Sequence, residues 1–89
     1  MSVQVYEGDG VARPTHISIA GNWGHSVDDD CVLLKILPDG VGDINAIKRI
    51  RVEARVTIEF AGDVLFENML VSRKRFVKDA GHWAIWLED

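Results

Sequence analysis

The sequence has a single cysteine, Cys31, among its 89 residues, so it cannot form an intramolecular disulfide. Disulfides stabilise many small secreted domains, and their absence favours a reducing compartment. The first ten residues, MSVQVYEGDG, lack the basic start and the apolar stretch of a signal peptide. No apolar run approaches the roughly 20 residues that a membrane-spanning helix requires. These absences predict a cytoplasmic protein that does not associate with a membrane.

The sequence also lacks the motifs that frame known catalytic sites. It contains no G-x-S-x-G elbow, no glycine-rich phosphate loop and no H-x-E…C-x-x-C arrangement. Cys31 together with His16, His25 or His82 could supply a nucleophile and a base, but every protein of this size contains such residues. We therefore expect no enzymatic activity and no cofactor.

One short segment, GHSVDDDC, gathers five residues of types that bind metals: His25, Asp28, Asp29, Asp30 and Cys31. Their spacing matches neither the paired ligands of zinc sites nor the alternating acids of a calcium-binding EF-hand loop. The alternative is that the acids complement a helix N-terminus or form a solvated loop beside a small core cysteine. The sequence leaves this choice open, and we assign no metal site.

Composition predicts one globular domain that spans residues 1–89. The chain is 47% hydrophobic and 27% charged, and its length is too small for two independent cores. Residues 1–47 hold two basic and seven acidic residues, a net −5, whereas residues 48–89 hold eight basic and seven acidic residues, a net +1. The total of −4 repels nucleic-acid phosphate at long range, so nucleic-acid binding would need a local basic patch.

The clearest periodicity lies in IRVEARVTIEF, residues 50–60, where every even-numbered residue from Ile50 to Phe60 is apolar and every odd-numbered residue is polar. This alternation predicts a β-strand with one buried face. Eleven residues would span roughly 35 Å, which is longer than a usual strand. We therefore expect this strand to bend, to bulge or to serve two neighbours.

The segments that follow predict a meander of antiparallel strands. Gly62 in AGD favours a short hairpin loop, after which VLFENMLVSRKRFV returns as the partner strand. Its apolar residues fall on both faces, which indicates either that both faces are partly covered or that a bulge near Glu67 and Asn68 switches the register. KDAG at 78–81 supplies another turn and HWAIWLE the last strand, so residues 46–88 read as three antiparallel strands.

The first half of the chain is less regular. VQVY and HISIA are typical of short strands, but residues 26–37, SVDDDCVLLKIL, fit two structures. Ser26 with Asp29 matches a helix capping box, whereas CVLLKIL alone matches a buried strand. The predicted fold is therefore mainly β, either all-β or α+β. It is a single antiparallel sheet or meander of five to six strands, with one short helix over residues 27–37 as the open alternative.

The tryptophans are the first candidates for a binding surface. In a strand over residues 82–88, Trp83 shares an apolar face with Ile85 and Leu87, while Trp86 lies on the opposite face. We expect Trp83 in the core and Trp86 at a partly exposed edge or interface. Trp23, between Gly21 and Gly24, is expected on a loop as a second docking residue. The alternative is that Trp86 and Trp23 simply fold back over a thin core and have no docking role.

A basic cluster supports a different function. Arg73, Lys74, Arg75 and Lys78 crowd one end of the predicted hairpin, near the tryptophans of the next strand. Sheets that present cations and aromatic rings commonly bind single-stranded nucleic acid. However, glutamates are interleaved with the arginines of these strands, and cross-strand Arg–Glu pairs also occur on ordinary solvated sheets.

These patterns favour a small acidic protein-binding module, an adaptor or inhibitor of the kind that phages and mobile elements encode. Its expected docking residues are Trp23, Trp86, Asp28, Asp29 and Asp30. Pairing with itself as a homodimer through an exposed strand edge is also expected. The alternative is a single-stranded nucleic-acid-binding protein that uses Arg73, Lys74, Arg75 and Lys78.

Overall fold

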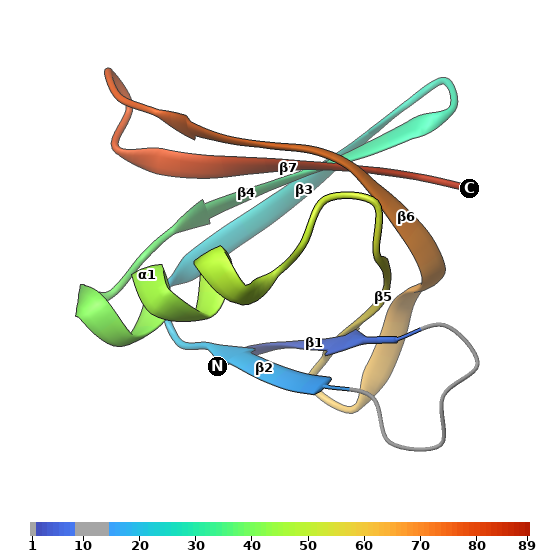
Figure 1. The fold of residues 1–89 in the computed structure, drawn as a ribbon, viewed down its shortest axis with the longest axis horizontal. Helices are drawn as coiled ribbons and strands as arrows, with labels where there is room; N and C mark the ends of the chain where they lie inside the picture. The colour runs from blue at the N-terminus through green and yellow to red at the C-terminus, as the bar shows by residue number, and fades with distance from the viewer. Residues whose placement is uncertain (1, 9–14) are drawn as a thin grey trace.

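The computed structural model describes residues 2–8 and 15–89. Within this part of the chain, seven strands form one antiparallel sheet and one short helix packs against it (Figure 1). In chain order the elements are β1 (Val3–Glu7), β2 (Thr15–Ile19), β3 (Asn22–Asp28), β4 (Cys31–Leu37), α1 (Gly40–Arg49), β5 (Arg55–Phe60), β6 (Asp63–Val77) and β7 (His82–Glu88). The prediction of a mainly β, single-sheet fold is confirmed, although the sheet has seven strands instead of five to six.

The sheet is rolled over on itself. Its strand order is β2-β1-β5-β6-β7-β4-β3, so β2 and β3 form the two edges although they are neighbours in the chain. The long strand β6 belongs to both halves, because its first part pairs with β5 and its last part pairs with β7. Figure 1 shows β6 curving from the layer of β1 and β2 to the layer of β3, β4 and β7. The predicted meander is confirmed in the consecutive pairing of β5, β6 and β7.

Bulges make the curvature of β6 possible. Between the pairs Val56–Met69 and Ile58–Phe66, β6 contains one more residue than β5, and Asn68 has a φ of 53°. An extra residue bends a strand and exchanges its two faces. The predicted bulge at Glu67 and Asn68 is thereby confirmed. It explains why Phe66 and Met69, which differ in parity, both contact the core.

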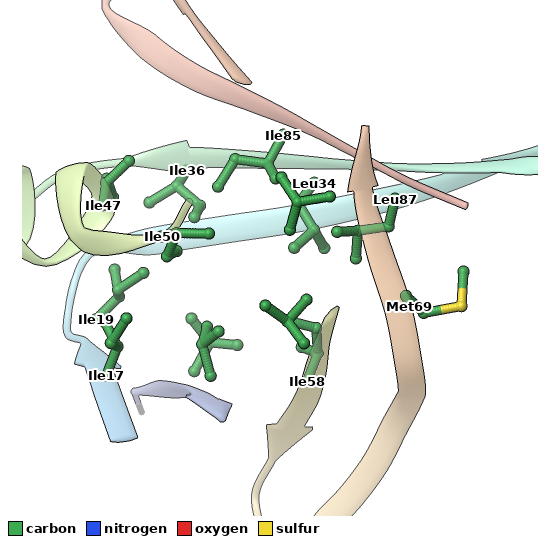
Figure 2. Close-up of a cluster of buried hydrophobic side chains, with 14 of the residues drawn as sticks. Ile17, Ile19, Leu34, Ile36, Ile47, Ile50, Ile58, Met69, Ile85 and Leu87 are labelled. Carbon is green, nitrogen blue, oxygen red and sulfur yellow. The ribbon is translucent and has the colours of Figure 1, made fainter. Parts of the chain in front are cut away.

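The hydrophobic core fills the space between the two layers of the roll. Ile50, directly after α1, lies between Ile36 of one layer and Ile19 of the other (Figure 2). Full burial of such a side chain contributes roughly 1.5–3 kcal/mol. The fully buried large side chains are Ile17, Ile19, Ile36, Ile47, Ile50, Ile58, Ile85, Leu87, Val3, Val5, Val56 and Val71.

The helix lies at residues 40–49, and the segment 27–37, for which helix and strand were both open, contains no helix. Cys31–Leu37 forms β4, in which Val32, Leu34 and Ile36 alternate with more exposed neighbours, as the strand alternative for this segment required. The helix presents a buried stripe of Asp43, Ala46 and Ile47 at the helical spacing, and Ile50, directly after the helix, is buried next to it. No helix of the described chain is long and apolar enough to cross a lipid bilayer.

The predicted strand over residues 50–60 is wrong for its first five residues. Ile50 caps α1, and its amide donates a hydrogen bond to the carbonyl of Ile47. Val52 is 47% exposed and Glu53 has a φ of 75°, so the chain turns here and β5 begins only at Arg55. Burial of Ile50 at the end of α1 and the turn that follows therefore override the two-residue alternation over residues 50–54.

A buried carboxylate joins the sheet corner to the helix. The Asp43 side chain accepts hydrogen bonds from the backbone amides of Ala20 (3.0 Å), Gly21 (2.7 Å) and Asp39 (2.7 Å). Burial favours the neutral acid, but the three amides outweigh it and hold the pKa of Asp43 below its ordinary value. Asp43 thus fixes the turn between the edge strands β2 and β3 to the start of α1.

Candidate protein-docking face

The outer surface of β6, β7, β4 and β3 carries Trp86, a half-buried aromatic side chain that lies outside the hydrophobic core. Helix α1 and the layer of β1 and β2 lie on the other side of these strands (Figure 1). The cross-strand register arranges the outward residues in rows. We call this surface the Trp86 face; its rows are Leu70–Glu88–Cys31–Asp28, Arg73–Trp86–Leu33–Ser26 and Arg75–Ala84–Lys35–Gly24.

Trp86 forms the centre of this face. The guanidinium carbon of Arg73 lies 4.9 Å from the centroid of the Trp86 ring, which is a cation–π contact. Leu33 lies opposite Trp86 on the other neighbouring strand, and both side chains are half-buried. The prediction that Trp83 and Trp86 face opposite ways is confirmed, since Trp83 packs against the core.

A bulge at Ser72 turns the arginines outward. Val71 pairs with Leu87 and Arg73 pairs with Trp86, so Ser72 is an extra residue between two consecutive pairs. Its hydroxyl donates a hydrogen bond to the carbonyl oxygen of Trp86 at 3.2 Å. Without the extra residue, Arg73 would share the inner face with Val71. The bulge therefore creates the contact between Arg73 and Trp86.

Charge changes sign along the strands of the Trp86 face. Glu88 and Asp28 lie in the row on one side of Trp86, and Arg75 and Lys35 lie in the row on the other side. Asp29 and Asp30, in the turn after β3, and Asp89 extend the acidic end, and all of them are exposed. A partner with the opposite order of charges would be held in one orientation.

Lys74 is separated from the other members of the basic cluster. Its ammonium donates hydrogen bonds to the carbonyls of Ile47 (3.0 Å), Lys48 (3.3 Å) and Ile50 (2.7 Å) at the C-terminus of α1. Burial lowers the pKa of Lys74, and the Glu7 carboxylate opposes that shift. Lys74 thus caps the helix from the inner face.

The other basic residues do not form one patch either. Arg73 and Arg75 are exposed on the Trp86 face, whereas Lys78 is exposed in the turn between β6 and β7. Since Lys74 faces the helix, the structure brings together only two of the four residues that the nucleic-acid hypothesis required.

Replacing Lys74 with methionine is expected to lower the free energy of unfolding by about 1–2 kcal/mol. Methionine preserves most of the apolar stem but leaves the carbonyls at the end of α1 without their charged donor. Urea unfolding monitored by far-UV circular dichroism measures the change. Arg75→Met is the matched control, because Arg75 is exposed on the outer face. Equal effects of the two substitutions would contradict the capping role.

Trp23 does not belong to the Trp86 face. Trp23 belongs to β3, so its predicted loop position is wrong, and its half-buried ring packs edge-on against Phe60 at 5.0 Å between centroids. His25 similarly contacts Phe66 at 5.2 Å. Because β3 is far from β5 and β6 in the strand order, these aromatic contacts close the roll. Of the predicted docking residues, Trp86 and Asp28 lie in the rows of the Trp86 face and Asp29 and Asp30 lie in the turn at its acidic end, whereas Trp23 faces the inner side.

The candidate metal and catalytic residues are dispersed. In the described ranges 2–8 and 15–89, no three His, Cys, Asp or Glu side chains are grouped closely enough to share a metal ion. His25 faces the inner side of the β3–β4 hairpin and Cys31 the outer side, because cross-strand neighbours alternate between faces. His82 lies at the opposite end of β7 from the residue that pairs with Cys31. His16 stacks on Tyr6 at 4.8 Å in the other layer.

Sequence reasoning missed Leu33 and Lys35 as members of this face. Their alternation with buried residues indicates that they point outward, but their place beside Trp86 depends on the pairing of β4 with β7, which are separated by three other elements. No local pattern predicts that pairing. No protein-family model matches the chain, and neither a curated protein nor a solved structure matches it.

Proposed function

We propose that this chain is a protein-binding module, an adaptor or inhibitor, that docks on a partner protein through the Trp86 face. The observation that supports this most is the half-buried Trp86, in cation–π contact with Arg73, at the centre of the outer sheet surface. Tryptophan and arginine dominate the energetics of protein interfaces because they remove a large area from water. The expected partner presents an apolar side chain flanked by charges in the order opposite to that of this face.

Several contacts disfavour the alternative of a nucleic-acid-binding surface. Arg73 already covers one face of the Trp86 ring, which base stacking would need. The ammonium of Lys74 is used by the helix. Asp28 and Glu88 lie on the same surface and would repel phosphate. Single-stranded nucleic acid is the second candidate ligand, because three cations lie close to Trp86: Arg73, Arg75 and Lys35.

Trp86→Ala is expected to weaken binding of the partner by about 30-fold or more, as loss of a central hot-spot residue does. Quantitative capture from a lysate of the source cell, followed by titration of the captured protein, measures this effect. Arg73→Ala, an exposed position, is expected to weaken the same complex. Val41→Ala is the control, because Val41 is 71% exposed on α1 and lies outside the face. A partner that binds wild type and Trp86→Ala equally would refute docking through this face.

Retention of single-stranded polynucleotide at low salt discriminates the second candidate. We expect no salt-sensitive retention of the wild-type protein. Retention that is lost in the double substitution Arg73→Glu and Arg75→Glu would replace the protein-binding proposal with the nucleic-acid one.

A further inference from the structure

One edge of the sheet is uncovered over the whole length of β3. This strand lies at the end of the strand order and pairs only with β4 within the described chain. Every residue from 24 to 30 is exposed, and the tip of the β3–β4 hairpin points away from helix α1 and from the layer of β1 and β2 (Figure 1). Natural edge strands are commonly protected by proline or lysine, and β3, with the sequence NWGHSVD, contains neither. This edge is therefore open to another strand.

The turn of the hairpin determines which backbone groups point outward. Asp29 and Asp30 form a two-residue loop, and Asp28 faces Cys31 across it. In such hairpins the residues that flank the loop exchange hydrogen bonds, and the pattern repeats at every second residue. Trp23, His25 and Val27 then direct their backbone groups toward the free edge.

We propose that β3 pairs with β3 of a second copy, antiparallel and centred on His25. In this register His25 lies opposite the partner's His25, and Trp23 lies opposite the partner's Val27. It is the register that engages all three outward-directed residues of both strands, each pair forming two backbone hydrogen bonds. The two seven-stranded sheets become one continuous sheet.

The side chains fit this register. Val27 is 68% exposed on the inner face of the hairpin, and pairing brings it against Trp23 of the second copy. Asp28 lies opposite the partner's Asn22, so no two formal charges of the same sign are opposed. A second copy is the occupant that this complementarity selects, because the apolar and polar positions of β3 match their own reversed order.

The dimer goes beyond the proposed function, since it uses the edge of β3 and leaves the Trp86 face open. One strand pair buries less than the roughly 1,200 Å² of a standard interface, so the association should be weak and dependent on concentration. Loss of dimerisation and loss of partner binding are therefore separately measurable. Val27→Lys tests the first and Trp86→Ala tests the second.

Sedimentation equilibrium and light scattering up to about 1 mM protein measure the association. The wild type is expected to form dimers increasingly as its concentration rises. Val27→Lys is expected to raise the dissociation constant at least about 10-fold, because lysine on an edge strand opposes pairing. Val41→Lys is the matched control, since Val41 is 71% exposed on α1. A wild type that stays monomeric throughout, or equal effects of the two substitutions, would overturn the proposal.

Cross-linking tests the register itself. In a Cys31→Ser background, His25→Cys places two thiols opposite each other at a separation that a disulfide can bridge. Mild oxidation is expected to yield a covalent dimer. Ser26→Cys in the same background is offset by two residues from its own copy and should cross-link at least about 10-fold less. Far-UV circular dichroism verifies folding of each variant, and equal cross-linking at the two positions would overturn the His25-centred pairing.

Discussion

Gly21→Ala is expected to lower the free energy of unfolding by more than about 4 kcal/mol, enough to unfold a domain of this size. A Cβ atom at this position would overlap the carbonyl oxygen of Leu37 and would lie 2.9 Å from both the Asp39 amide nitrogen and a carboxylate oxygen of Asp43. Two of these atoms are backbone, and the third belongs to a carboxylate that three hydrogen bonds hold in place. The clash therefore forces the corner between β2 and β3 to open. Far-UV circular dichroism and urea unfolding measure the loss.

Gly24→Ala is the matched control for this substitution. Gly24 lies three residues further along in β3, and a Cβ atom there meets no atom within 4 Å. Alanine is also more favourable than glycine in a strand by roughly 0.5–1 kcal/mol, so this variant should be at least as stable as the wild type. If the two alanine variants unfolded at the same urea concentration, the tight corner at Gly21 would be refuted.

The sequence predicts best the parts of the fold that are joined by short turns. The alternation of Val56 and Ile58, the loop at Gly62 and the apolar face of β7 define three consecutive strands that pair in sequence order. The opposed tryptophans of β7 follow from the same alternation. Mixed parity around Glu67 indicated either a bulge or two partly covered faces, because an unbroken strand with one covered face would have exposed part of its apolar side chains.

Long-range pairing and the helix were not predictable in this way. Residues 40–49 contain two glycines, which disfavour a helix, and a carboxylate occupies the buried stripe where an apolar residue is usual. Ile50 fits both the helical spacing of the preceding residues and the two-residue alternation of the following ones. Because the alternation was the clearer pattern, Ile50 was predicted to begin a strand. The spacing of Asp43, Ala46, Ile47 and Ile50 was the available signal for the helix.

Part of the candidate site could be predicted from the sequence, for the same reasons. The outward direction of Trp86 follows from parity within one strand. In contrast, the separation of Lys74 from Arg73 and Arg75 depends on the extra residue Ser72, and a run of three cations carries no indication of a bulge. The basic surface predicted from residues that are neighbours in the sequence was therefore larger than the one that the fold forms.

Asp43→Asn is expected to lower the free energy of unfolding by about 3 kcal/mol at neutral pH. One carboxylate oxygen accepts the amides of Gly21 and Asp39, and the other accepts the amide of Ala20. An asparagine supplies only one oxygen, so its NH₂ group must face at least one of these donors. Asp39→Asn is the control, because the Asp39 side chain is exposed and forms no cap hydrogen bond.

The same substitution should change how stability depends on pH. Since the pKa of Asp43 is lower in the folded than in the unfolded protein, its contribution is complete above the ordinary aspartate value of about 4 and disappears as the pH falls through the folded-state value. The difference in stability between wild type and Asp43→Asn should therefore shrink steadily below about pH 4. Urea unfolding at pH 7, 4 and 3 measures it. A difference that stays constant over this range would mean that the lost stability comes from packing and not from the ionised carboxylate that joins the corner of β2 and β3 to α1.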